Sequence, residues 1–152
     1  MLKFSDGTVK NATVPSKEGV ENEAFQFIVK SEGFNSKCYI DGAGGGYSQG
    51  YGHMCLGGKI SELDSRQILL KDIIRINELI IGDFSINQRV GMISFLYNHP
   101  VTQKGYINRI NNNFPEFQSL LWQKSNNHVY HNGVRQGGLL TRRKEEYDLI
   151  FN

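Results

Sequence analysis

Two acidic residues, Glu32 and Asp41, lie nine residues apart in a glycine-rich part of the chain. Such a pair could share acid–base work, because glycosidic bond cleavage needs one acid to protonate the leaving oxygen and a second carboxylate to activate water or stabilise charge. The spacing alone is weak support, since two acids this far apart occur in most proteins. The glycines between 42 and 52 add to it, because they let a backbone turn tightly and approach a ligand closely. No lysine follows them in the frame of a phosphate loop, so a hairpin beside a polymer groove is the better interpretation.

The elements that must position these acids follow from the hydrophobic pattern. Helical periodicity begins at Asn22, and Gly33 is a typical helix stop, so Glu32 should lie in the last turn of a first helix. Residues 35–60 hold short apolar stretches separated by glycines, which predicts a small antiparallel sheet. Asp41 would then reach the same cleft from the sheet side.

The rest of the chain reads as helical. A long amphipathic helix is expected from about 61 to 81, because Ser61 is a start signal and apolar residues recur at helical steps. A second start signal, Ser85 with Gln88, opens a helix that Pro100 ends. Shorter helical patterns occupy about 103–111, 115–124 and 139–150.

These patterns predict an α+β, mainly helical fold. Residues 1–18 would form an N-terminal arm or a hairpin around Asp6-Gly7, followed by one domain over 19–152. Within that domain we expect a small β lobe at about 35–60, an interlobe helix at about 61–81 and a helical lobe at about 84–152.

Composition restricts the classes of function. A net charge of +2 is too small to indicate nucleic-acid binding, and no run of apolar residues is long enough for a membrane span. The N-terminus lacks the pattern of a signal peptide, so we expect synthesis as a cytosolic protein or export by a route that the chain does not encode. Cys38 and Cys55 could form one disulfide, although two free thiols are the default in that compartment. The spacing of cysteines and histidines predicts no metal site and no cofactor.

Several motifs together resemble the phage-type lysozymes, the endolysins that hydrolyse bacterial peptidoglycan. The pattern of that family is matched by Glu32-Gly33-Phe34, Asp41 and Gly50-Tyr51-Gly52-His53. Three more segments agree in order and distance: 61–72 with the start of the interlobe helix, ISFLYN at 93–98 with the SFxFN helix, and 137–146 with the GLxxRRxxE signature. The resemblance covers about residues 20–152 and implies a lysozyme-like fold.

The resemblance also implies catalytic roles. Glu32 would donate a proton to the glycosidic oxygen, and Asp41 would position or activate water on the opposite face of the sugar, as in an inverting glycosidase. In the family a threonine helps to hold that water, and Ser48 is the hydroxyl that could replace it. Ser48 lies seven residues after Asp41, one more than in the family pattern. A bulge could bring Ser48 into place; otherwise Tyr47 would occupy the position.

Further residues are expected to support the site. By resemblance, Arg142 should lie close to Glu32, whereas residues 142–146 taken without the family read as a solvated helix face. His53 could act as a base, but a structural role that fixes the hairpin is favoured. Sugar contacts are assigned by resemblance to Met54, Tyr97 and Asn98.

The leading hypothesis is a muramidase that cleaves the β-1,4 bond between N-acetylmuramic acid and N-acetylglucosamine. It would be a monomer that accumulates in the host cytoplasm until a membrane lesion such as a holin pore admits it to the cell wall. Peptidoglycan strands would be its partner, with no nucleic acid and no membrane insertion. The alternatives are a catalytically weakened glycan- or protein-binding domain, a lytic transglycosylase, a virion-associated lysozyme and a delivered antibacterial toxin. In the last two cases the N-terminal arm could be a docking element.

Overall fold

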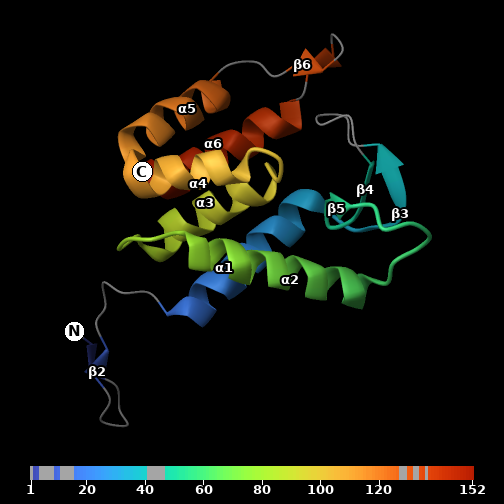
Figure 1. The fold of residues 1–152 in the computed structure, drawn as a ribbon, viewed down its shortest axis with the longest axis horizontal. Helices are drawn as coiled ribbons and strands as arrows, with labels where there is room; N and C mark the ends of the chain where they lie inside the picture. The colour runs from blue at the N-terminus through green and yellow to red at the C-terminus, as the bar shows by residue number, and fades with distance from the viewer. Residues whose placement is uncertain are drawn as a thin grey trace.

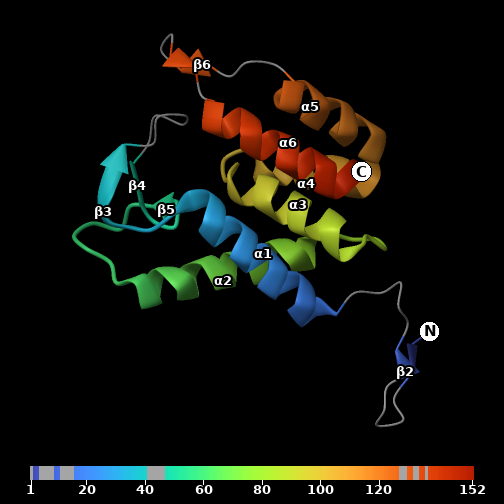
Figure 2. The same ribbon diagram turned by 180° about the vertical axis from the view of Figure 1, so that it is seen from behind.

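The computed structural model describes residues 2–3, 9–10, 16–40, 47–126, 130–131, 134–135 and 137–152. In these parts of the chain there are six α-helices and three small antiparallel sheets (Figures 1 and 2). The predicted α+β, mainly helical architecture is confirmed. Asp41 and the glycines that follow it lie outside the described residues, as does the Asp6-Gly7 turn signal.

The first helix, α1 (Lys17–Glu32), ends at the predicted acid. It begins earlier than the expected Asn22, because the Ser16 side chain caps the first turn by accepting a hydrogen bond from the Gly19 N–H at 3.0 Å. The Gly33 N–H donates back to the Val29 carbonyl and closes the last turn. Glu32 is therefore the final helical residue, where its side chain can leave the helix toward the neighbouring sheet.

The next two helices follow the predicted start signals. Helix α2 (Glu62–Leu79) is capped by Ser61, and α3 (Ile86–Tyr97) carries a complete capping box between Ser85 and Gln88. The apolar residues that predicted these helices are buried in the core: Leu69, Ile73, Ile76 and Ile80 of the interlobe segment, and Val90, Ile93 and Leu96 of α3. The helical periodicity was therefore a correct guide to which face packs inward.

Helix α3 is the centre of the helical lobe. It packs against α1 and α6 (Gly137–Phe151), while α4 (Gln103–Asn112) and α5 (Phe114–Asn126) complete the lobe (Figure 1). Gly91 lets α3 approach α6 closely, since a Cβ there would lie 2.7 Å from Ile150 Cγ1 and 2.9 Å from the Glu146 carbonyl oxygen. None of the described helices is long and apolar enough to cross a membrane.

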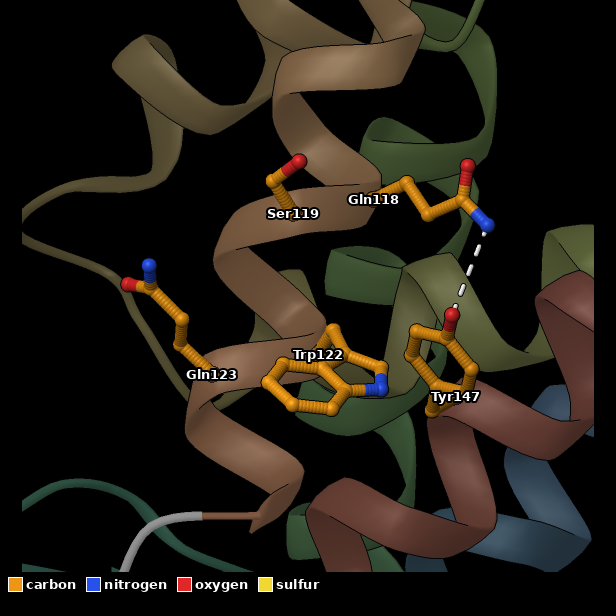
Figure 3. A pocket seen from close by; sticks show the side chains of 5 residues that line it. All are labelled: Gln118, Ser119, Trp122, Gln123 and Tyr147. Carbon is orange, nitrogen blue, oxygen red and sulfur yellow. Dashed lines mark hydrogen bonds between the residues drawn. The ribbon is translucent and has the colours of Figure 1, made fainter.

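A pocket of about 340 Å³ lies between α5 and α6 (Figure 3). The residues that line it are Gln118, Ser119, Trp122, Gln123 and Tyr147. The Gln118 amide donates to the Tyr147 hydroxyl at 3.4 Å and links the two helices across it. This pocket contains none of the residues predicted to form the site.

The small sheet has the strand order β3-β4-β5, formed by Asn35–Ile40, Tyr47–Gly50 and His53–Met54. Ile40 pairs with Tyr47 and Tyr39 with Ser48 in the antiparallel pair of β3 and β4. The register shifts between Asn35 and Tyr39. A bulge or irregularity is thus present between these two residues of β3. The bulge predicted for the glycine-rich hairpin falls on 41–46, outside the described residues.

Two further pairs of very short strands occur. β1 (Leu2–Lys3) pairs with β2 (Val9–Lys10), in agreement with the predicted N-terminal hairpin. β6 (Tyr130–His131) pairs with β7 (Val134–Arg135), a hairpin that the sequence analysis missed. Strands of two residues have no detectable alternation of apolar and polar side chains, so the hydrophobic pattern did not indicate β6 and β7.

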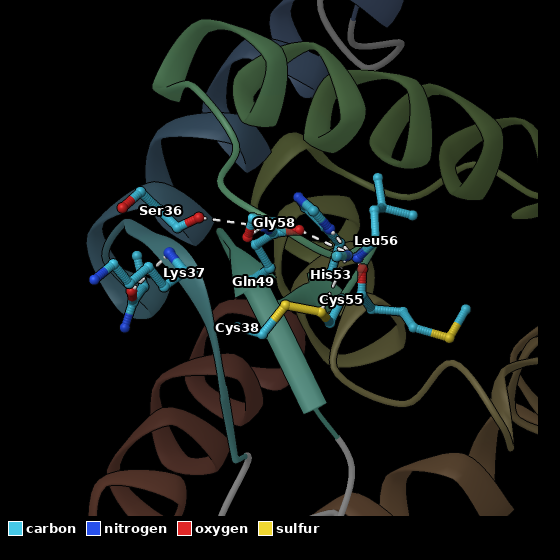
Figure 4. Close-up of a disulfide and its surroundings, with 11 residues drawn as sticks. Ser36, Lys37, Cys38, Gln49, His53, Cys55, Leu56 and Gly58 are labelled. Carbon is cyan, nitrogen blue, oxygen red and sulfur yellow. Dashed lines mark hydrogen bonds between the residues drawn. A yellow bond between two sulfur atoms is a disulfide. The ribbon is translucent and has the colours of Figure 1, made fainter.

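The β lobe is fastened by a disulfide and a buried glutamine (Figure 4). Cys38 and Cys55 are bonded with their Cα atoms 5.5 Å apart, which corrects the expectation of two free thiols. Beside them the fully buried Gln49 donates to the carbonyls of Ser36 and Gly58 at 3.1 and 2.9 Å and accepts from the Leu56 N–H at 3.2 Å. These bonds join β3, β4 and the segment after β5.

Candidate active site

Glu32 lies where α1, the sheet and the helical lobe meet, and only 15% of its side chain is exposed. Its Oε1 accepts hydrogen bonds from Arg142 Nη1 of α6 and, at 3.3 Å, from the amide of Asn98, which caps α3. The ion pair with Arg142 joins residues 110 positions apart in the sequence. The predicted proximity of Arg142 to Glu32 is present in the structure, and Asn98 is part of the same cluster.

The turn between β4 and β5 closes over the other side of this carboxyl group. A Cβ at Gly52 would lie 2.8 Å from Glu32 Oε2, and Gly52 has a φ of +89°, so both space and backbone conformation favour glycine here. Tyr51 fixes the turn, because its carbonyl accepts from the Tyr97 hydroxyl at 2.5 Å and its N–H donates to Ser65 Oγ at 2.9 Å. The turn is therefore held by α2 and α3 together.

Tyr97, predicted as a sugar contact, is instead mostly buried. Burial raises its pKa above the ordinary value of a phenol, and the nearby negative charge of Glu32 acts in the same direction. The hydroxyl thus stays protonated and serves as the donor to Tyr51. Only the small exposed part of the ring is left for contact with a substrate.

The two arginines of α6 have different partners. Arg142 donates from Nε to Ser94 Oγ at 3.3 Å and from Nη2 to the Ser94 carbonyl at 3.4 Å. Arg143 pairs with Glu146 at 2.6 Å and lies over the Phe95 ring. These three charged residues are buried, whereas Lys144 and Glu145 are exposed. The interpretation of 142–146 as a solvated face is thus wrong for the face that packs on α3.

Glu146 is a completely buried carboxylate. Burial raises its pKa, and the cations of Arg143 and Arg142 together with a hydrogen bond from Ser94 act against this rise. Burial likewise lowers the pKa of Arg143, and the negative charge of Glu146 opposes that change. Each buried charge is therefore compensated by an opposite charge within the same cluster.

His99 packs against this cluster from the end of α3. Its ring lies 4.2 Å from Phe95 between ring centroids and meets Tyr106 edge to face. Nδ1 donates to the Phe95 carbonyl at 2.7 Å, because a carbonyl can only accept. Burial lowers the pKa of His99 to about 4, the hydrogen bond to Phe95 opposes this, and the charge of Arg143 adds to it.

Ser48 and Tyr47 occupy opposite environments. Ser48 is 7% exposed and lies on β4, the central strand, whereas Tyr47 is 64% exposed at the start of that strand. Successive strand residues point to opposite faces, so the two side chains lie on different sides of the sheet. Of the two, only the serine is buried.

His53 and Met54 form β5. His53 is buried, and its Nδ1 donates to the Met54 carbonyl at 3.0 Å, which fits the favoured structural role. Met54 is 77% exposed, so its side chain is available for contact with a ligand. Among the described residues no group of His, Cys, Asp and Glu converges as metal ligands would.

Sequence reasoning did not assign roles to Ser94, Gln49 or Glu146, although each lies inside or beside a quoted motif. Ser94 is in the 93–98 segment and Glu146 ends the GLxxRRxxE signature. Their role depends on contacts between α3 and α6, which no local pattern contains.

A carboxyl group at the end of a helix, between a small sheet and a helical lobe, defines a lysozyme-like fold and site. Solved structures with this fold include an endolysin from Escherichia coli O157:H7 phage FAHEc1, which is 24% identical with a TM-score of 0.55 and matches over 95% of this chain and 97% of that one. The muramidase domain of SpmX from Asticaccaulis excentricus is 22% identical with a TM-score of 0.58, over 90% and 97%. The active form of the P1 phage endolysin Lyz is 16% identical with a TM-score of 0.59, over 92% and 96%.

The sequence itself shows the family. The model of the phage lysozyme family matches residues 29–146, so the chain belongs to the phage lysozymes. It is accordingly a glycoside hydrolase that degrades peptidoglycan. A search of curated protein sequences gives no significant match.

The half-buried His99 makes stability depend on pH. Its pKa of about 4 in the folded state lies below the ordinary value, so protonation favours the unfolded chain. The stabilisation is complete above about pH 6.5 and is lost as the pH falls toward 4, by up to about 3 kcal/mol. We expect the free energy of unfolding, measured by urea titration, to fall over this range.

In the variant His99→Gln this part of the pH dependence should disappear. An equal slope in the parent and in His99→Gln would contradict the assignment.

Proposed function

We propose that this lysozyme is a muramidase that hydrolyses the β-1,4 bond between N-acetylmuramic acid and N-acetylglucosamine, with Glu32 as the general acid. The position of Glu32 carries the proposal. Two N–H donors converge on Oε1, and a proton on that oxygen would face both of them. The acidic proton therefore belongs on Oε2, beside the turn at Gly52.

The surroundings of Glu32 suit an acid that changes charge during the reaction. Arg142 would stabilise the carboxylate that remains after proton transfer. Because the guanidinium is held in advance, little reorganisation is needed when the charge develops. Asn98 adds a neutral donor to the same oxygen.

We assign Asp41 to the activation of water on the opposite face of the sugar, with Ser48 as a second hydrogen-bonding partner. Asp41 is the first residue after β3, and Ser48 pairs with Tyr39 on the neighbouring strand, so the two flank the same hairpin. A water between two carboxyl groups would give inversion at the anomeric carbon. NMR of the first product formed from a soluble glycan would show the α-anomer, and a β-anomer would reject inversion.

We further propose that the enzyme acts as a monomer on the cell wall after release through a membrane lesion such as a holin pore. Membership of the phage lysozymes supports this route. The alternative of a glycan-binding domain with weakened catalysis is favoured by the serine and by the extra residue in the hairpin. Turnover of peptidoglycan by the parent protein distinguishes the two.

The variant Glu32→Gln removes the acidic proton and keeps the shape of the side chain. We expect its turnover of peptidoglycan to fall by roughly 10²–10⁴-fold. Glu23→Gln, on the exposed part of the same helix, is the control and should remain active. The fragments should be analysed by mass spectrometry: reducing muramic acid ends indicate hydrolysis, and anhydro ends would indicate a transglycosylase. Full activity of Glu32→Gln would reject the assignment.

Variants at 47 and 48 test which residue holds the water. Ser48→Ala should lower kcat by roughly tenfold or more, since a group that positions a reactant is lost. Ser48→Thr should stay active, because threonine keeps the hydroxyl and restricts its rotamers. Tyr47→Phe should behave as the parent, because most of that side chain is exposed. The reverse result, with Tyr47→Phe inactive and Ser48→Ala active, would transfer the role to Tyr47.

A further inference from the structure

Ser94 and Glu146 lie behind the Glu32–Arg142 pair, and neither has a role in the mechanism above. Both side chains are fully buried. Ser94 Oγ is 2.5 Å from Glu146 Oε2, and Arg142 Nε is 3.5 Å from the same oxygen. The close contact of α3 and α6 at Gly91 keeps the two helices at the separation that these bonds need.

We propose that Ser94 and Glu146 are positioning residues that orient Arg142 and share its charge, and so set the pH range over which Glu32 can act as an acid. This inference rests on the proposed role of Glu32. The guanidinium is planar and rigid, so contacts of Nε and Nη2 with Ser94 fix its orientation. With the guanidinium fixed in this way, Nη1 is directed toward Glu32 Oε1.

The direction of the hydrogen bonds is determined by chemistry. A guanidinium can only donate and a carboxylate can only accept. Ser94 Oγ must therefore accept from Arg142 and donate its own proton to Glu146. A hydroxyl can connect these two groups, because it has both a donor and an acceptor on a single atom.

The charges around Glu32 give the direction of the effect. Arg142 of α6 faces Glu32 directly, and Arg143 and Glu146 of the same helix lie farther away. The groups that face it from α3 are the neutral Tyr97 and Asn98, and the β4–β5 turn faces it with Gly52. The negative charge of Glu146 partly cancels the electrostatic effect of the Arg142 cation on Glu32. Without that negative charge Arg142 would act on Glu32 alone, and Glu32 would lose its proton at lower pH.

The test is the pH profile of kcat/KM for peptidoglycan hydrolysis by the full chain. Glu146→Gln keeps the size of the side chain and removes the charge, so the alkaline limb of the profile should move to lower pH. Glu145→Gln removes the same charge from the exposed neighbour and should leave the limb in place. A merely structural role would scale the whole profile down without moving the limb, and that result in folded protein would overturn the proposal.

A second variant separates orientation from charge. Ser94→Ala keeps every charge, so it should lower kcat by roughly tenfold while KM changes little and the alkaline limb shifts less than in Glu146→Gln.

Circular dichroism and thermal unfolding establish that each variant is folded. Should Glu146→Gln fail to fold, Ser94→Ala decides, and an unchanged kcat would overturn the proposal. Loss of activity in Glu32→Gln is measured in parallel, because activity of that variant would refute the assignment of Glu32 and not the roles of Ser94 and Glu146.

Discussion

The ion pair between Glu32 and Arg142 is the interaction on which the arrangement of this enzyme depends. Removing both charges from water costs several kcal/mol per ion, so the surroundings must supply hydrogen bonds and counter-charges. Asn98 and Ser94 supply the former and Glu146 the latter. The helices that provide them are α1, α3 and α6, and this explains why α3 lies at the centre of the lobe and why α6 packs closely against it.

The β lobe also contacts the Glu32 side of the Glu32–Arg142 ion pair. Gly52 brings the backbone against the Glu32 carboxyl group, and any larger residue would displace it. Tyr97 and Ser65 hold the turn at Tyr51, while the disulfide and Gln49 hold the strands to each other. One side of the site is thus built from helices with charged groups, and the other from a small cross-linked sheet with hydrogen-bonded backbone.

Local patterns predicted what depends on neighbours in the sequence. Capping residues such as Ser61 and Ser85, and apolar residues at helical spacing, gave the helices and their buried faces. The motifs placed Arg142 against Glu32. They did not reveal the burial of Glu146, because a charged segment resembles a solvated face until the packing partner is known. The pairing of Cys38 with Cys55 likewise depends on the fold of the strands and not on the spacing of the cysteines.

The central claim is that Glu32 protonates the glycosidic oxygen in a cleft between the two lobes. A crystal structure of Glu32→Gln with an oligomer of alternating N-acetylglucosamine and N-acetylmuramic acid tests this most directly. The account predicts the bridging oxygen within about 3 Å of the residue 32 side chain, with a water held by Asp41 and Ser48 on the opposite face of the sugar. A glycan bound only elsewhere, such as in the pocket between α5 and α6, would contradict it.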